Sequence, residues 1–205
     1  MTTTQTTQVF DSQPARDDDV RARIFAGALR LFSQRGFAAT SLREVAEEAG
    51  ASKPMIYYYF GSKEDLYGSI VQEILEEMAT AIRQRLAPGA PPHERLLEFC
   101  RAYLDYFMSN EDVIALVLRE VFGLGDAMRR FSETLGEQVR RPLDEILEAG
   151  MESGVFHVDH VGRCATAITG VLNMFILAHV FGGTRLDADD IVHQVEYYAA
   201  GLRGN

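Results

Sequence analysis

A short stretch of this 205-residue chain gathers hydrogen-bond donors and aromatic rings without a single acidic residue. Within eleven residues it contains Lys53, Met55, Tyr57, Tyr58, Tyr59 and Lys63. Tyrosine hydroxyls and lysine ammonium groups are suited to donate to phosphate oxygens. Because a helix turns by about 100° per residue, three consecutive tyrosines cannot all face a core. Some of these rings are therefore expected at the surface, where an exposed aromatic residue needs a partner.

Other chemistry finds less support in the sequence. His157 and His160 flank Asp159, but three ligands in one loop without a fourth rarely make a metal site, so we predict none. We find no glycine-rich phosphate loop, nucleophile elbow or His-Glu-x-x-His motif. The sequence therefore predicts neither an enzyme nor a bound cofactor.

Two short helices must position the donor-rich stretch. Ser41 and Glu44 have the spacing of a capping box at the start of the first helix, and Gly50 ends it. Ser52 is expected to cap the second helix, 53–60, with Pro54 in its first turn, where a missing N–H costs little. Two helices joined by a short glycine-containing turn predict a helix-turn-helix.

The rest of the chain has helical periodicity and no sustained alternation, so we predict an all-α fold. Residues 1–18 are polar, lack periodicity and are expected to form a disordered tail. A first helix runs from Asp18 to Gly36, and Ser62 caps a long helix that ends near Leu86. Further helices are predicted near 93–108, 111–122, 125–152, 160–182 and 188–202.

Charge is unevenly distributed along the chain, whose formal net charge is −10. Residues 19–70 hold seven Lys/Arg and six Asp/Glu, whereas residues 71–205 hold twelve and twenty-one. An acidic body can still bind nucleic acid if the few cations of its N-terminal part share one face. The polar N-terminus has no signal-peptide pattern, and Cys100 and Cys164 suggest reduced thiols in a cytoplasmic protein.

The segment Thr40–Leu66, TSLREVAEEAGASKPMIYYYFGSKEDL, closely resembles the DNA-binding domain of TetR-family transcriptional regulators. Ala28, Leu31–Phe32 and Gly36–Phe37 match the first helix of that domain and its glycine turn. The resemblance is specific over residues 20–68, about a quarter of the chain. It implies a helix-turn-helix domain over 19–68 and a C-terminal ligand-binding and dimerisation domain over 69–205.

The resemblance also implies which residues contact DNA. They are Ser41, Arg43, Ser52, Lys53, Pro54, Met55, Tyr57, Tyr58, Tyr59 and Lys63. The helix 53–60 is expected to lie in the major groove, with Lys53, Pro54 and Met55 at the bases. Tyr57 and Tyr59 match positions that contact phosphates or thymine methyl groups, and Lys63 matches a phosphate-binding lysine. Met55 departs from the small or polar residue usual at its position and offers apolar contact alone. Ile56 and Phe60 are assigned to the core.

The last two helices are expected to form a dimer interface, since DNA reading of this kind uses two copies about 34 Å apart. The predicted interface residues are Ile168, Leu172, Phe175, Ile176, Ile191, Val195, Tyr198 and Leu202. A helix that is apolar on nearly all sides needs burial on more than one side. An internal core helix is the alternative. The apolar stretch 165–183 approaches the length of a membrane span, but Asn173 and His179 interrupt it, so no membrane partner is predicted.

The middle helices are rich in large soft side chains, which resemble the effector cavity of the family. The predicted lining comprises Phe99, Tyr103, Phe107, Arg119, Phe122, Met128, Asn173, Met174 and His179, with Leu116, Phe131 and Phe175 as further apolar members. Ordinary core packing is the alternative for each of them. Arg119 is either a cation for an acidic ligand or the partner of Glu120 or Glu98.

These observations predict a DNA-binding regulator, most simply a repressor that releases a palindromic operator when a small molecule binds. A transcriptional activator of the same family is the first alternative. A small-molecule-binding helical protein with a vestigial helix-turn-helix is the second.

Overall fold

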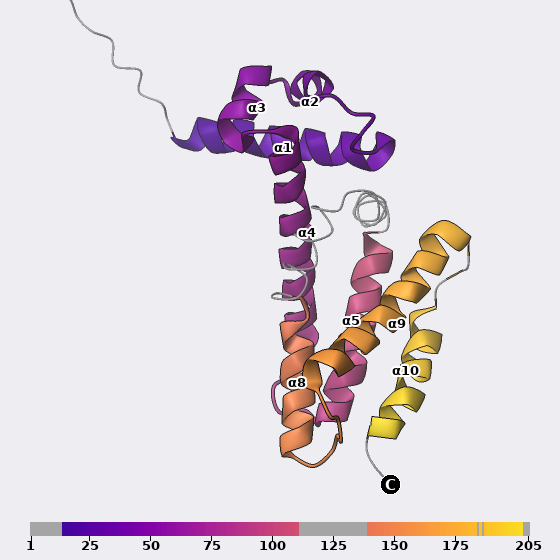
Figure 1. The fold of residues 1–205 in the computed structure, drawn as a ribbon. Coiled ribbons are helices and arrows are strands. Elements are labelled where there is room, and N and C mark those ends of the chain that lie inside the picture. Colours follow the sequence, from indigo (N-terminus) through magenta and orange to yellow (C-terminus); the bar gives the residue numbers. More distant parts are fainter. Residues whose placement is uncertain (1–13, 111–138, 184, 186, 203–205) are drawn as a thin grey trace, which may run out of the picture. The chain divides into compact units, whose positions relative to one another are not determined.

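The computed structural model describes residues 14–110, 139–183, 185 and 187–202, and all regular elements in these ranges are α-helices (Figure 1). In chain order they are α1 (Pro14–Arg35), α2 (Leu42–Ala49), α3 (Lys53–Phe60), α4 (Lys63–Arg85), α5 (Pro92–Ser109), α8 (Arg141–Glu152), α9 (Val161–Gly182) and α10 (Ala188–Leu202). The prediction of an all-α fold is confirmed. The helix predicted near 111–122 and the first half of the one near 125–152 lie outside the described residues.

The chain divides into two compact units, residues 1–67 and 68–205, and the boundary falls within α4. We call them the N-terminal and the C-terminal unit. The helix α1 begins at Pro14, so the tail predicted through residue 18 is wrong for residues 14–18. Proline suits the first turn of a helix because its fixed φ and missing N–H are tolerated there. Residues 1–13 of the predicted tail lie outside the described part.

The core of the N-terminal unit forms where α1 packs against α2 and α3. Ile24, Ala28 and Phe32 of α1 are fully buried, as are Val45 and Ile56 of the two shorter helices. The spacing of the α1 residues places them on one face of the helix. Gly36 follows α1 in the left-handed region, at φ 84°, and its N–H donates to the carbonyl of Phe32 at 2.8 Å. The predicted glycine terminus is therefore confirmed.

The C-terminal unit is assembled around α5, which packs against α8, α9 and α10 (Figure 1). The α5 residues Leu96, Phe99 and Leu104 are completely buried. The predicted inner face of α4 is also buried, including Ile70 and Ile82. The N–H of Asp65 donates to the Ser62 hydroxyl at 3.0 Å, which confirms the predicted cap of α4.

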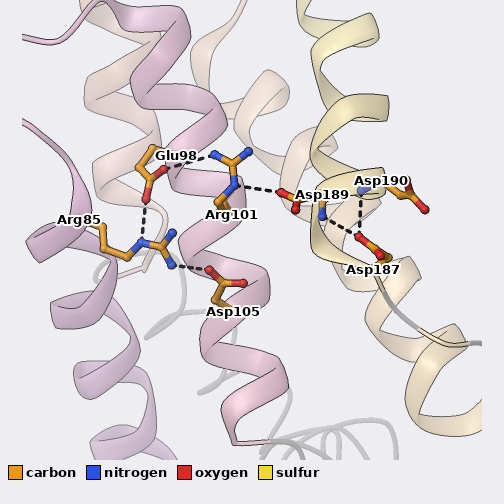
Figure 2. A network of polar contacts seen from close by, with 7 residues as sticks. All are labelled: Arg85, Glu98, Arg101, Asp105, Asp187, Asp189 and Asp190. Carbon is orange, nitrogen blue, oxygen red and sulfur yellow. Dashed lines mark hydrogen bonds and ion pairs between the residues drawn. The ribbon is translucent and has the colours of Figure 1, made fainter.

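Ion pairs join α4, α5 and the start of α10 (Figure 2). Arg85 at the end of α4 donates to Glu98 at 2.7 Å and to Asp105, both on α5. These hydrogen bonds, the one to Asp105 foremost, raise the pKa of Arg85. Arg101 bridges Glu98 and Asp189 of α10, at 3.4 Å from each. Through two guanidinium groups, the network thus connects α10 with the consecutive helices α4 and α5, which lie far from it in the sequence.

Candidate nucleic-acid interface

The helix α2 starts with the capping box that the sequence predicts. The Ser41 backbone N–H donates to Oε2 of Glu44 at 2.8 Å, and the Glu44 N–H donates to the Ser41 hydroxyl at 3.3 Å. The hydrogen bonds from Ser41, first the backbone and then the hydroxyl, lower the pKa of Glu44, and the charge of Arg35 acts in the same direction. The arrangement fixes where α2 begins, and it satisfies two N–H groups at the start of the helix.

The turn between α2 and α3 depends on Gly50. This residue adopts the left-handed conformation, φ 59° and ψ 37°, and its N–H points back to the carbonyls of Ala46 and Glu47. A side chain with a Cβ disfavours this conformation, so glycine allows α2 to end sharply. The chain then extends through Ser52, at φ −100° and ψ 152°, before α3 begins.

The predicted side-chain cap at Ser52 is wrong. Ser52 occupies the N-cap position of α3, but its hydroxyl makes no capping hydrogen bond. One physical reason is that Pro54 in the first turn has no N–H and removes one of the donors that a cap would satisfy. Ser52 is therefore exposed at the start of α3, and its hydroxyl does not cap the helix.

The helix α3 has a buried side and an exposed side. Ile56 and Phe60 are 0% and 8% exposed, as predicted for the core, whereas Tyr57 and Tyr58 are 48% and 78% exposed. Tyr59 is half-buried, and its ring meets that of Tyr58 edge-on at 5.0 Å. The expectation that the three tyrosines cannot all face inward is confirmed.

The exposed side of α3 also carries Lys53. Its Nζ lies 5.7 Å from the centroid of the Tyr57 ring, and Pro54 beside it is exposed as well. Met55 is half-buried and offers only part of its thioether side chain to solvent. The surface thus presents an ammonium group, two phenol rings and a proline on one short helix, a combination suited to phosphates and base edges.

The acidic residues of α2 are paired with arginines. Arg35 binds Glu44 at 3.0 Å and Arg30 binds Glu48 at 2.8 Å. Arg43 binds Glu47 at 2.8 Å, and this hydrogen bond raises the pKa of Arg43. Such pairs reduce the repulsion that the α2 carboxylates would exert on a phosphate backbone. The sequence gives the near-neutral charge of this segment, but the partners in α1 are visible only in the structure.

Lys63 has an orientation that the sequence did not indicate. Its Nζ donates to the Phe37 carbonyl and lies 4.1 Å from the centroid of the Phe37 ring. The side chain is half-buried. Lys63 therefore differs from Lys53, which is exposed on α3.

The residues predicted to line an effector cavity are only partly brought together. Phe99, Tyr103 and Phe107 are buried on α5, and the Tyr103 hydroxyl donates to Oδ1 of Asn173 on α9 at 2.7 Å. Burial raises the pKa of Tyr103 well above its usual value. His179 is half-buried. Other predicted members lie outside the described residues: Leu116, Arg119, Phe122, Met128 and Phe131.

Met174 does not belong to that set. It is 66% exposed, because it is about 100° around α9 from Asn173, which faces α5. The prediction that Met174 lines a cavity is therefore corrected. Phe175 is 38% exposed and also lies on the outer side of α9.

The predicted dimer residues need a similar correction. Leu172 and Ile176 of α9 and Ile191 and Val195 of α10 are at most 5% exposed within one chain, so they belong to the core of the C-terminal unit. Ile168 is half-buried, and the side chains of Tyr198 and Leu202 lie outside the described part. The apolar residues exposed on α9 and α10 are instead Val171, Met174, Phe175, Phe181 and Tyr197.

The helix α9 is long and apolar enough to cross a membrane, by length and composition, and 17% of its apolar window is buried within the chain. One such helix is weak evidence of a membrane span, and four residues of α9 are buried within the chain: Ala165, Thr169, Leu172 and Ile176. Among the described residues, no group of three His, Cys, Asp or Glu side chains is arranged to hold a metal ion. At the start of α9, His160 Nδ1 accepts the Arg163 N–H at 3.4 Å, so it acts as an N-cap.

The two units and the surface of α3 define an all-helical DNA-binding protein of the helix-turn-helix class. Comparison with known proteins agrees with this description. Residues 24–70 match the family described as "Bacterial regulatory proteins, tetR family", and residues 89–177 match "Tetracyclin repressor-like, C-terminal domain". The chain belongs to the TetR family of transcriptional regulators.

Several relatives are transcriptional regulators. The repressor NicS of Pseudomonas putida is 28% identical over 144 residues, 69% of this chain and 68% of the relative. The activator FasR of Mycolicibacterium smegmatis is 32% identical over 100 residues, but the match covers only 49% of this chain and 46% of FasR. The Bacillus subtilis regulator FadR, solved with stearoyl-CoA, shares the fold with a TM-score of 0.76, at 20% identity over 90% of this chain and 98% of FadR.

Proposed function

We propose that the protein is a homodimeric repressor that holds a palindromic operator through α3 of each copy and releases it when a small molecule binds the C-terminal unit. The observation that carries the proposal is the two-sided character of α3. Ile56 and Phe60 anchor one side in the core, while Lys53, Tyr57 and Tyr58 extend from the other. A helix of eight residues is about 12 Å long, which suits insertion into a major groove about 12 Å wide.

Within this proposal the exposed residues of α3 contact the groove, and the start of α2 contacts the phosphate backbone. Ser41 and Arg43 are both exposed. An exposed ion pair such as Arg43–Glu47 contributes little to stability, so Arg43 can exchange Glu47 for a phosphate at small cost. The hydroxyl of Ser52, which caps nothing, is a further donor to the backbone.

Dimerisation in this proposal uses the outer face of α9. Val171, Met174 and Phe175, with Phe181 two turns beyond Met174, expose large apolar side chains on one helix. An apolar face of this extent is typical of an interaction surface. The partner in this proposal is a second copy of the chain. One copy has few cations for DNA and binds it weakly, whereas two copies can bind both half-sites of a palindrome.

Matched methionine variants test the dimer. Met174→Glu places a charge on the outer face of α9, whereas Met151→Glu places the same charge at an exposed methionine of α8. We expect Met174→Glu to sediment as a monomer and to lose operator binding, and Met151→Glu to remain dimeric and active. A dimeric Met174→Glu protein contradicts this assignment of the interface.

Selection from a random-sequence duplex library, followed by mobility-shift titration, tests DNA reading. The wild-type protein should select a palindrome. Lys53→Met should weaken binding to it, and Arg141→Met, which removes an exposed cation from α8, should not. If the wild-type protein enriches no duplex, or if Lys53→Met binds as tightly as the wild type, the proposal fails.

Effector binding is proposed to favour the arrangement of the dimer that does not fit DNA, with a coupling free energy of about 1–3 kcal/mol. FadR of Bacillus subtilis was solved with stearoyl-CoA, so long-chain acyl-CoA esters are the first effectors to test. The expected result is release of the selected duplex in proportion to the added ester. The role is regulatory, takes place in the cytoplasm and requires no catalysed reaction.

A transcriptional activator is the second candidate, favoured by the similarity to FasR. Both candidates require the same DNA-binding surface. Deletion of the gene distinguishes them, since transcription from the bound promoter rises if the protein represses and falls if it activates.

A further inference from the structure

The arginines of the N-terminal unit differ in whether an acidic residue lies beside them. Residues 19–67 contain five arginines, and four of them form an ion pair; Arg23, for example, pairs with Asp19 at 3.6 Å. Arg21 on α1 is exposed and forms neither an ion pair nor a hydrogen bond with any residue that the structure describes. A guanidinium group carries five N–H donors, so those of Arg21 are open to a partner outside the chain.

An aromatic ring of α3 holds the guanidinium of Arg21 in place. Its Cζ lies 5.3 Å from the centroid of the Phe60 ring, within the range of cation–π attraction. Phe60 is only 8% exposed and belongs to the core of the N-terminal unit, so the ring is a fixed support. Arg21 is therefore positioned at the last residue of α3 while its N–H donors remain unused.

Phe60 is in line with Lys53 and Tyr57 along α3. The three residues have the spacing i, i+4 and i+7, which places them on one flank of a helix. The Lys53 ammonium lies 5.7 Å from the centroid of the Tyr57 ring, so each of the two rings has one cation beside it. Seven residues of α-helix rise by about 10 Å. This flank of α3 thus has a cation near each end, one from α3 itself and one from α1.

Phosphates flank a helix that lies in the major groove. The groove is about 12 Å wide, close to the diameter of a helix with its side chains, so the flanks of α3 would approach the two backbone strands. In a helix-turn-helix the N-terminal residues of the second helix contact the base edges. The other end of α3, at Phe60, then lies nearer to the edge of the groove, where the phosphates are. A guanidinium group suits a phosphate there, because it can donate two parallel hydrogen bonds.

We propose that Arg21 is a phosphate-binding residue of the DNA-reading unit: held by the Phe60 ring, it donates to the backbone strand that flanks the C-terminal end of α3. The inference rests on the proposed function, because it needs α3 to lie in the major groove. It extends the DNA-binding surface to α1, whereas the family resemblance indicated contacts between Ser41 and Lys63 alone.

The salt dependence of binding tests the contact. Arg21→Met removes the charge and keeps an unbranched side chain that can still pack against the Phe60 ring. Each phosphate contact contributes about −0.9 to the slope of log K against log salt, so loss of one cation from both copies of a dimer should make the slope shallower by about 1.8. Between 50 and 200 mM salt, the wild type should then lose about tenfold more affinity for its selected duplex than the variant does.

Arg23→Met is the matched control. It removes the same charge from an exposed position of the same helix, two residues from Arg21. Arg23 is paired with Asp19 and lies about 200° around α1 from Arg21. The control should keep the wild-type slope, which separates a local contact from a general loss of positive charge. Far-UV circular dichroism at the assay temperature shows that both variants are folded.

Neutral phosphates in the DNA locate the contact. Each phosphate of one half-site of the selected duplex is replaced in turn by an uncharged methylphosphonate. At one position, the wild type should bind severalfold more weakly than to the unmodified duplex, and Arg21→Met should bind both duplexes equally. Such non-additivity indicates a direct interaction between the two altered groups, and a variant that is merely less stable does not produce it at a single phosphate.

Three results overturn the inference while the proposed function stands. They are a wild-type slope in Arg21→Met, an equally shallow slope in Arg23→Met, and a scan in which no methylphosphonate distinguishes Arg21→Met from the wild type. If the wild type selects no duplex, the proposed function fails and the inference fails with it.

Discussion

Gly150 in α8 has no room for a side chain, and its replacement by alanine should destabilise the C-terminal unit. A Cβ at this position would lie 2.0 Å from Cδ2, 2.6 Å from Cε2 and 2.8 Å from Cγ of Phe156. Phe156 is only 2% exposed, and its backbone N–H donates to the Gly150 carbonyl at 2.9 Å. The hydrogen bond holds the Phe156 backbone next to Gly150. The ring therefore cannot move away from a new Cβ without leaving its buried position.

The change in the free energy of unfolding combines a packing cost with a gain in helix propensity. Overpacking in a core costs about 1–3 kcal/mol, and loss of the Phe156 ring from its site would cost about 3–5 kcal/mol. Alanine is favoured over glycine within a helix by about 1 kcal/mol. We expect Gly150→Ala to lower the free energy of unfolding by about 2–3 kcal/mol, which corresponds to roughly 6–10 °C in Tm for a unit of this size.

Urea unfolding followed by far-UV circular dichroism measures this change, with Gly68→Ala as the matched control. Gly68 also lies within a helix, but nothing is within 4 Å of the position that its Cβ would take. That variant should gain about 0.5–1 kcal/mol. In Gly150→Ala combined with Phe156→Ala, the cost of the glycine change should disappear. If Gly150→Ala is as stable as the wild type while Gly68→Ala behaves as expected, the packing argument is refuted.

Three further predictions concern charge, thiols and a buried hydrogen bond. The pKa of Glu44 is lowered, so its stabilising effect is complete above its ordinary value of 4.5 and is lost as the pH falls through the lowered value. Glu44→Gln should therefore melt below the wild type at neutral pH, and melting curves recorded over a pH series should converge in acid. Burial raises the pKa of Cys100 to about 12 and also raises that of the half-buried Cys164. An aromatic disulfide reagent should consequently label Cys164 alone in native protein and both thiols in urea; native labelling of Cys100 would contradict its burial. Tyr103→Phe leaves Oδ1 of Asn173 without its donor, and urea unfolding should show a loss of about 1–2 kcal/mol.

Short-range patterns were sufficient to predict the local structure of the DNA-reading unit. The Ser41–Glu44 spacing predicted the capping box, and the glycines at positions 36 and 50 predicted where helices end. Each of these features involves residues within one or two helical turns, so sequence spacing alone determines whether the groups can meet. The division of the α3 side chains into core and surface follows in the same way from the 100° rotation per residue.

Contacts between distant segments could not be predicted in this way. The apolar pattern of α9 and α10 indicated burial, but Leu172 and Ile191 are buried within one chain while Met174 is exposed, and only the packing of α5 against both helices decides between these positions.

By itself, the sequence determined the family, through the resemblance of residues 20–68. It also determined the helical fold and which residues of α3 face solvent, because these two depend on local propensity and helical periodicity. The tertiary structure alone decided the direction of Lys63. Its ammonium group meets the Phe37 carbonyl, 26 residues earlier in the chain, only after α1, the turn and α4 have come together. A lysine ammonium on its long flexible side chain can donate to water or to an acceptor within the protein. Which of these it reaches depends on the acceptors that the fold places near it.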